Sequence, residues 1–157
     1  MSELDELYQS LILDHNKSPR NFRELGEFSG HAEGRNPLCG DVFTVWVEVR
    51  DGLVADISFQ GQGCAISKAS ASMMTTTIKG KPVAEVRALF DRFHQMVTGK
   101  ISLGGDDKKE ARKALGCLSA FAGVSAFPIR VKCATLAWHA MMKAVEEGSG
   151  GTTNAIR

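Results

Sequence analysis

The sequence has no excess of charge of either sign. Its 157 residues include 19 Lys and Arg against 18 Asp and Glu, so the formal net charge is +1. Binding to nucleic acid through counterion release needs a basic excess, and this balance excludes a protein of that kind. Long hydrophobic runs are also missing. No stretch approaches the roughly 18 consecutive apolar residues of a membrane-spanning helix, so no such helix is expected.

The N-terminus lacks the basic head and apolar run of a signal peptide, because Glu3, Asp5 and Glu6 make its first residues acidic. We therefore expect a cytoplasmic protein without a membrane partner. Internal repeats are also lacking, and a chain of this length suits a single domain. We predict that this domain covers residues 1–147 and that residues 148–157 form a flexible tail rich in Gly and Thr.

Cysteines are few, and none of them forms a C-x-x-C pair; they are Cys39, Cys64, Cys117 and Cys133. The missing C-x-x-C argues against a dithiol redox protein, and a cytoplasmic domain of this size does not need disulfides. Reduced, reactive or metal-bound thiols are therefore expected. Cys117 falls in the middle of a predicted helix and is interpreted as a small core residue. His94 and His139 also lie in predicted helices and are interpreted as surface or core residues.

Hydrophobic periodicity predicts an α+β fold. Residues 42–49 and 53–60 alternate apolar and polar side chains, as strands with one buried face do, and an edge strand is expected near residues 28–32. Helical spacing of apolar residues predicts five helices, over residues 2–16, 65–79, 82–97, 111–122 and 134–147. Strands followed by helices indicate a small antiparallel sheet of about three strands, with helices packed on one face.

The two strong strands predict a hairpin whose register follows from their apolar residues. A three-residue loop over residues 50–52 aligns Val45 with Ile57, so that apolar side chains meet on one face of the sheet. Extending this register sets the segment 39–41 beside the segment 61–64. The cysteine of each segment is therefore expected at the open end of the hairpin.

Cys64 and Cys133 are both expected at helix N-termini, where unpaired N–H groups and the helix dipole lower the pKa of a thiol. Arg130 and Lys132 add positive charge just before Cys133. Three thiolates and one carboxylate suit a tetrahedral Zn²⁺ ion. The predicted ligands are Cys39, Asp41, Cys64 and Cys133. Each cysteine taken alone is explained equally well as a buried core residue.

Four motifs carry a resemblance to a known family. They are D-H-x-x-x-P-R-N at residues 14–21, N-P-x-C-G-D at 36–41, G-x-G-C-A-I-S-x-A-S-A-S at 61–72 and R-x-K-C-A-x-L-x-W at 130–138. With these motifs the chain resembles the iron–sulfur cluster assembly proteins of the IscU/NifU N-terminal type, and most closely their SufU branch. Lys132 stands where IscU-type scaffolds carry a His ligand, and an insertion at about residues 99–115 also favours the SufU branch.

The resemblance implies an IscU-like α+β fold with zinc on the four predicted ligands. It implies that Cys39 accepts sulfur, with Arg130 and Lys132 in support, in a sulfurtransferase that acts together with a cysteine desulfurase. The implied partners are a SufS-type desulfurase, which uses pyridoxal phosphate, and a downstream iron–sulfur assembly scaffold. The main alternative is a scaffold that assembles an iron–sulfur cluster on the same cysteines. More distant alternatives are a dithiol redox protein and a purely structural zinc protein.

Overall fold

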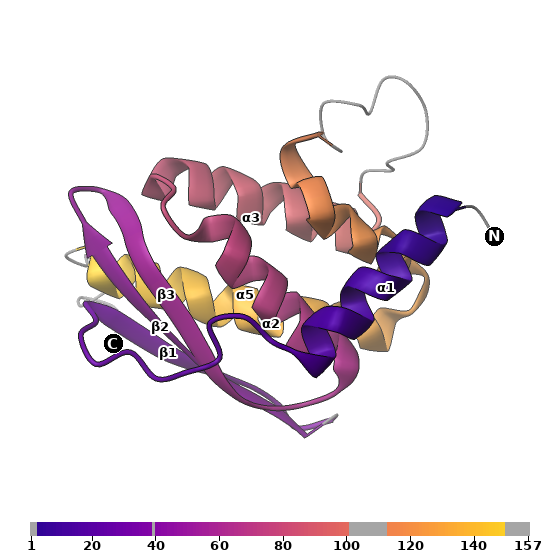
Figure 1. Cartoon of the computed structure of the whole chain (residues 1–157), viewed down its shortest axis with the longest axis horizontal. Coiled ribbons are helices and arrows are strands. Elements are labelled where there is room, and N and C mark those ends of the chain that lie inside the picture. The colour runs from indigo at the N-terminus through magenta and orange to yellow at the C-terminus, as the bar shows by residue number, and fades with distance from the viewer. Residues whose placement is uncertain (1–2, 39, 101–112, 150–157) are drawn as a thin grey trace.

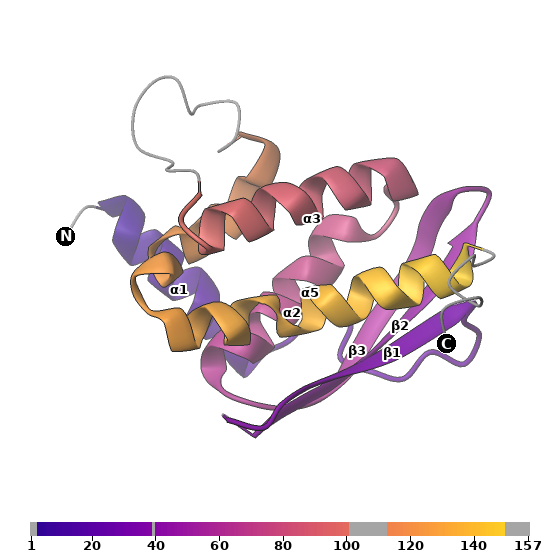
Figure 2. The ribbon, with the colours of Figure 1, turned by 180° about the vertical axis from the view of Figure 1, so that it is seen from behind.

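The computed structural model describes residues 3–38, 40–100 and 113–149 of the chain. Its elements in chain order are α1 (Glu3–Lys17), β1 (Gly30–Asn36), β2 (Asp41–Arg50), β3 (Leu53–Gln62), α2 (Ala65–Ile78), α3 (Val83–Val97), the 3-10 helix η2 (Gly116–Ala126) and α5 (Pro128–Gly148). The strands form one antiparallel sheet in the order β1-β2-β3. Helix α5 lies along one face of this sheet, with α2 and α3 packed on α5 (Figures 1 and 2). The predicted α+β architecture is confirmed.

The buried face of the sheet and the helices that cover it form one hydrophobic core. The fully buried apolar residues of the strands are Phe43, Val45, Val47, Val54, Ile57 and Phe59. From the helix side, Trp138 of α5 stacks on Phe93 of α3, with ring centroids 4.4 Å apart. No helix in the described ranges is long and apolar enough to cross a membrane.

The predicted hairpin exists, but its predicted register is wrong. The turn is a two-residue Asp51-Gly52 turn, and the positive φ of both residues (56° and 76°) is typical of the type I′ turns that join short hairpins. The pairing shifts between Glu48 and Val49, because a bulge adds one residue to β3. Val45 therefore pairs with Phe59 instead of Ile57. Val45, Ile57 and Phe59 lie on the predicted buried face, but near the turn the bulge exposes Leu53 and buries Val54 instead.

The predicted start of the last helix is also wrong. The helix was expected over residues 134–147, beginning after Cys133, but α5 begins at Pro128. Proline is favoured in the first turn of a helix, because its fixed φ suits the helix and its missing N–H needs no partner there. Cys133 therefore lies in the second turn of α5.

The helix predicted over residues 111–122 is wrong in type. Residues 113–115 are α-helical, and the chain continues as the 3-10 helix η2. Gly116 has a φ of +55°, a left-handed backbone that an α-helix cannot include. Residues 111 and 112, most of the insertion and the tail residues 150–157 lie outside the described residues.

The N-terminal motif links α1 to α2. His15 Nδ1 and Ser72 Oγ lie 2.7 Å apart, and the backbone N–H of Arg20 donates to the same hydroxyl at 2.8 Å. The Asn21 side chain donates to Thr75 at 3.0 Å. These hydrogen bonds give the motif a structural role in holding the first helix on the fold.

Acidification is expected to weaken this link. Burial lowers the pKa of His15, the Arg20 guanidinium lowers it further, and Asp14 partly offsets both effects. Because the pKa of His15 is lower in the folded than in the unfolded chain, His15 stabilises the fold at pH values above its ordinary pKa of 6.5. This stabilisation is lost as the pH falls from there through the lowered pKa of the folded state. Urea unfolding should show a larger stability loss on acidification for the wild type than for His15→Gln. An equal loss in both proteins would contradict this prediction.

Candidate metal centre

Three of the predicted ligands meet at one end of the sheet. The candidate ligand atoms of Asp41, Cys64 and Cys133 all lie within 4.8 Å of one another. Asp41 is the first residue of β2, Cys64 precedes α2 as its N-cap, and Cys133 lies in α5. These residues are far apart in sequence, and the hairpin and the two helices bring them together. The fourth predicted ligand, Cys39, lies outside the described residues.

Asp41 is the residue whose surroundings best fit a bound cation. Its side chain is fully buried, and its Oδ1 accepts a hydrogen bond of 2.9 Å from the backbone N–H of Cys64. Its Oδ2 is buried and has no hydrogen-bond partner. A buried carboxylate is costly unless it is paired or coordinates a metal ion. The free oxygen and the two adjacent thiols therefore fit a bound metal ion.

Cys64 is placed to bind as a thiolate. Burial raises the pKa of its thiol, but hydrogen bonds from the hydroxyl and backbone N–H of Ser67 and from Cys133 outweigh this effect, and the net pKa is lowered. The Ser67 N–H lies 3.5 Å from the sulfur, which is the N-cap interaction of α2. The prediction that Cys64 begins a helix is confirmed. The helix dipole also favours negative charge at this position.

Cys133 lies at the site, but at a different position in its helix from the predicted one. It is fully buried in the second turn of α5, where its thiol lies 3.7 Å from the carbonyl oxygen of Ile129. A hydrogen bond to Cys133 and the charges of both sulfurs raise the pKa of the Arg130 guanidinium. This contact places positive charge at the two thiols, as the sequence predicted for Arg130. Lys132 is exposed on the same helix.

Cys117 is not a core residue, and that interpretation is wrong. Its thiol is exposed on η2. The interpretation rested on the usual burial of free cysteine, whereas the neighbouring Leu118 takes the buried position on η2. Cys117 does not belong to the ligand group found among the described residues.

Two residues of the site, Ser67 and Gly63, were not predicted, although the sequence contains an indication of each. Ser67 follows Cys64 at the spacing of an N-cap and its third helical residue, where a hydroxyl can contact the capping atom. Gly63 precedes Cys64, and a Cβ atom there would lie 2.6 Å from both Asp41 Oδ1 and Ser67 Oγ. The site therefore requires a residue without a side chain at position 63.

The comparisons with known proteins identify the family. The family described as NifU-like N terminal domain matches residues 7–134. The chain belongs to this family. The resemblance that the four motifs indicated is confirmed, and it extends to nearly the whole chain.

Two curated relatives have different described functions. The zinc-dependent sulfurtransferase SufU of Bacillus subtilis (strain 168) is 42% identical over 150 residues, which cover 96% of this chain and 97% of that protein. The iron–sulfur cluster assembly scaffold protein IscU of Streptococcus pyogenes serotype M1 is 39% identical over 149 residues, covering 95% and 89%. Identity alone therefore does not separate the two functions.

A solved structure agrees with the fold. It is that of FiSufU from Fervidobacterium islandicum AW-1, described as a candidate iron–sulfur cluster assembly scaffold protein for the SUF system. It matches this chain with a TM-score of 0.77 at 30% sequence identity, and the match covers 89% of this chain and 97% of that one.

Gly63→Ala is expected to damage the site of this family member without unfolding it. The new methyl group would push the Asp41 carboxylate and the Ser67 hydroxyl apart, at a cost of about 1–3 kcal/mol in unfolding free energy. We expect zinc affinity, measured by competition with a chromophoric chelator, to fall about 10- to 100-fold. Gly26→Ala is the matched control, because a Cβ at Gly26 meets nothing within 4 Å. Equal zinc affinity in both variants would contradict the prediction.

Proposed function

We propose that this chain is a zinc-binding sulfur carrier in iron–sulfur cluster assembly. Its zinc ligands would be Cys39, Asp41, Cys64 and Cys133. The observation that carries the proposal is the buried, unpartnered Oδ2 of Asp41 beside two thiols. The similarity to a zinc-dependent sulfurtransferase along almost the whole chain supports it.

Each residue of the site has a defined task in this proposal. When bound, zinc would keep its sulfur ligands deprotonated and contribute folding free energy of the order of 10 kcal/mol. Asp41 holds the start of α2 in place through the Cys64 N–H, and Ser67 stabilises the Cys64 thiolate. Arg130 supplies positive charge at the two sulfurs, and Lys132 is a second, exposed cation on the same helix. We expect these cations to favour a thiolate, and later a persulfide anion, on Cys39.

The proposed reaction moves one sulfur atom from a cysteine desulfurase to Cys39. The Cys39 thiolate attacks the outer sulfur of a persulfide, Cys–S–SH, on the desulfurase. A new S–S bond forms at Cys39, the S–S bond of the donor breaks, and the donor cysteine leaves as a thiolate. The proton stays on the terminal sulfur, and no net oxidation or reduction takes place. The Cys39 persulfide would then pass its outer sulfur to a downstream assembly scaffold.

A second candidate function is a scaffold that assembles an iron–sulfur cluster on the same residues. The identity to an IscU scaffold protein, only slightly lower than that to SufU, favours it. A scaffold that carries an iron–sulfur cluster should be coloured and contain bound iron after anaerobic purification.

One purification and one assay test the proposal. Anaerobically purified protein should be colourless and contain about one zinc per chain, as a single four-ligand site requires. Adding it to a SufS-type cysteine desulfurase should increase cysteine turnover, and the Cys39→Ala variant should not. Bound iron without zinc would favour the scaffold. Zinc without any effect on turnover would leave only a structural zinc protein.

A further inference from the structure

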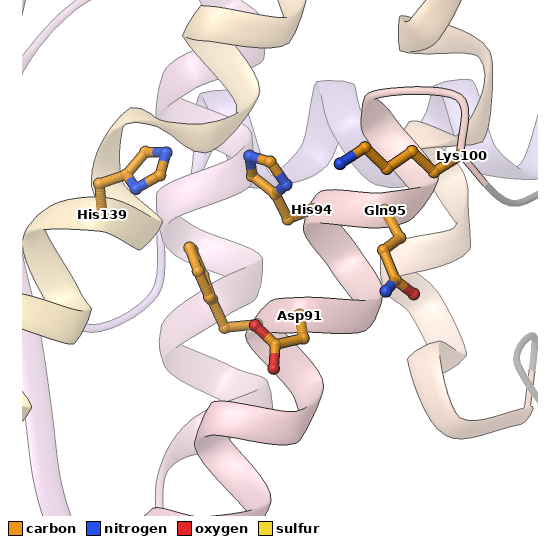
Figure 3. Close-up of a pocket in the computed structure, with 6 residues that line it drawn as sticks. Asp91, His94, Gln95, Lys100 and His139 are labelled. Atoms are coloured by element: carbon orange, nitrogen blue, oxygen red, sulfur yellow. The ribbon is translucent and has the colours of Figure 1, made fainter.

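A second group of possible metal ligands lies between α3 and α5. These helices border a cavity of about 390 Å³ lined by Phe90, Asp91, His94, Gln95, Lys100 and His139 (Figure 3). His139 comes six residues after Cys133 on α5. Six residues turn an α-helix by about 240°, so the two side chains leave α5 on different faces. The pocket is therefore separate from the thiol site.

The two histidines in this pocket face one another. Ring nitrogens of His94 and His139 point toward each other across the gap between the helices (Figure 3). Their ring centroids are 5.8 Å apart, with the ring planes at 76°. With metal–nitrogen bonds of about 2.0–2.1 Å, two imidazoles on one ion have centroids about 5–6.5 Å apart. The observed spacing lies within this range, so both rings can bind one ion without moving the helices.

Phe90 holds the two rings in this arrangement. Its ring centroid lies 5.9 Å from that of His94 and 5.3 Å from that of His139, the latter edge to face. Such contacts restrict the rotation of both imidazoles. Since less rotational freedom is lost when the rings bind a ligand, the pair is partly preorganised.

We infer that His94 and His139 form a second metal site, which takes a divalent transition-metal ion on two imidazole nitrogens. Water completes the coordination shell, because the pocket is open to solvent and no third His, Cys, Asp or Glu of the described residues joins the pair in a three-ligand group. The nitrogen donors distinguish this site from the sulfur-rich one. Imidazole suits zinc, iron, nickel and copper.

The charges around the pair have opposing effects on a bound cation. Burial lowers the pKa of His139, and His94 and Lys143 lower it further, which favours the neutral imidazole that a metal ion needs. Asp91 attracts a cation, while Lys100 and Lys143 repel one. Lys100 is exposed on a flexible stem and can turn its ammonium group away. An anion in the same pocket would instead be attracted by the two lysines and repelled by Asp91.

Nickel is the probe, because it binds imidazole strongly and its charge-transfer bands reveal any sulfur ligand. Zinc-loaded full-length protein is titrated with Ni²⁺ by calorimetry near neutral pH. We expect one Ni²⁺ per chain without zinc release and without a sulfur-to-nickel absorption band. His94→Gln and His139→Gln should each weaken binding at least about tenfold. His31→Gln, which changes an exposed histidine of β1, should bind as the wild type does.

Two further variants separate a cation from an anion. Lys100→Gln removes a repulsive charge, so Ni²⁺ should bind as tightly as in the wild type or more tightly, whereas Asp91→Asn should weaken binding. Unchanged Ni²⁺ affinity in both histidine variants would overturn the inference, as would a sulfur-to-nickel band. Binding of inorganic phosphate that Lys100→Gln abolishes, with no Ni²⁺ binding, would overturn it as well and identify an anion site.

Discussion

Asp41→Ala is expected to reduce the zinc affinity of the chain by more than about 100-fold, beyond the effect of losing a group that only supports a ligand. The reason is that Asp41 would provide a ligand oxygen and is also the acceptor for the Cys64 N–H. In the metal-free protein the same substitution removes a buried carboxylate whose Oδ2 has no partner. Metal-free Asp41→Ala is therefore expected to be at least as stable as the metal-free wild type. Chelator competition and urea unfolding measure the two effects.

Asp41→Asn is the matched variant for this prediction. It keeps an oxygen that can accept from the Cys64 N–H but removes the negative charge. We expect it to hold zinc less tightly than the wild type and more tightly than Asp41→Ala. If zinc affinity is the same in all three proteins, Asp41 is not a ligand, and its buried carboxylate needs another explanation.

The largest loss of stability is expected for Trp138→Ala, at about 3–5 kcal/mol in unfolding free energy. Trp138 is fully buried against Phe93, and its indole N–H donates to Ser70 Oγ at 3.1 Å. Ser70 in turn donates to the carbonyl of Ala134 at 2.6 Å, next to Cys133. The substitution leaves a cavity between α2, α3 and α5 and removes a partner of Ser70.

Trp138→Phe separates packing from hydrogen bonding. It keeps most of the ring that stacks on Phe93 and loses only the indole N–H donor, so we expect a loss nearer 1–2 kcal/mol. Urea unfolding of both variants measures the difference. Equal losses in Trp138→Phe and Trp138→Ala would show that the hydrogen bond to Ser70, and not the stacked ring, dominates.

Periodicity predicted the strands and most helices, but it could not predict local backbone irregularities. The bulge in β3 breaks the alternation near the turn, where Val54 is buried and Leu53 is exposed, and the pattern of apolar residues did not indicate this shift. Pro128 fits both an extended segment and a helix start, and only packing on the sheet selects the helix. The shift of Gly116 into a left-handed backbone likewise could not be inferred from the sequence.

The sequence predicted the described residues that meet at the candidate site, but it placed one of them wrongly in its helix. Cys64 begins a helix as expected, but Cys133 reaches Asp41 from the second turn of α5 and not from its first residue. Asp41 and the two cysteines still meet, because the turn and the bulge together leave the same face of the hairpin buried at the end that carries Asp41. The His94 and His139 pair gave no signal in the sequence, since it depends on how α3 and α5 pack. The role of Cys39 remains a prediction.

The most direct test of the central claim is the mass of the chain after incubation with a SufS-type desulfurase and cysteine. Intact-mass and peptide analysis should find one added sulfur atom, on the peptide that contains Cys39. Cys117→Ala should acquire it too, because that exposed thiol lies outside the site, whereas Cys39→Ala should not. A wild-type chain that acquires no sulfur, or that carries it on Cys117, would contradict the assignment of this protein as a sulfur carrier.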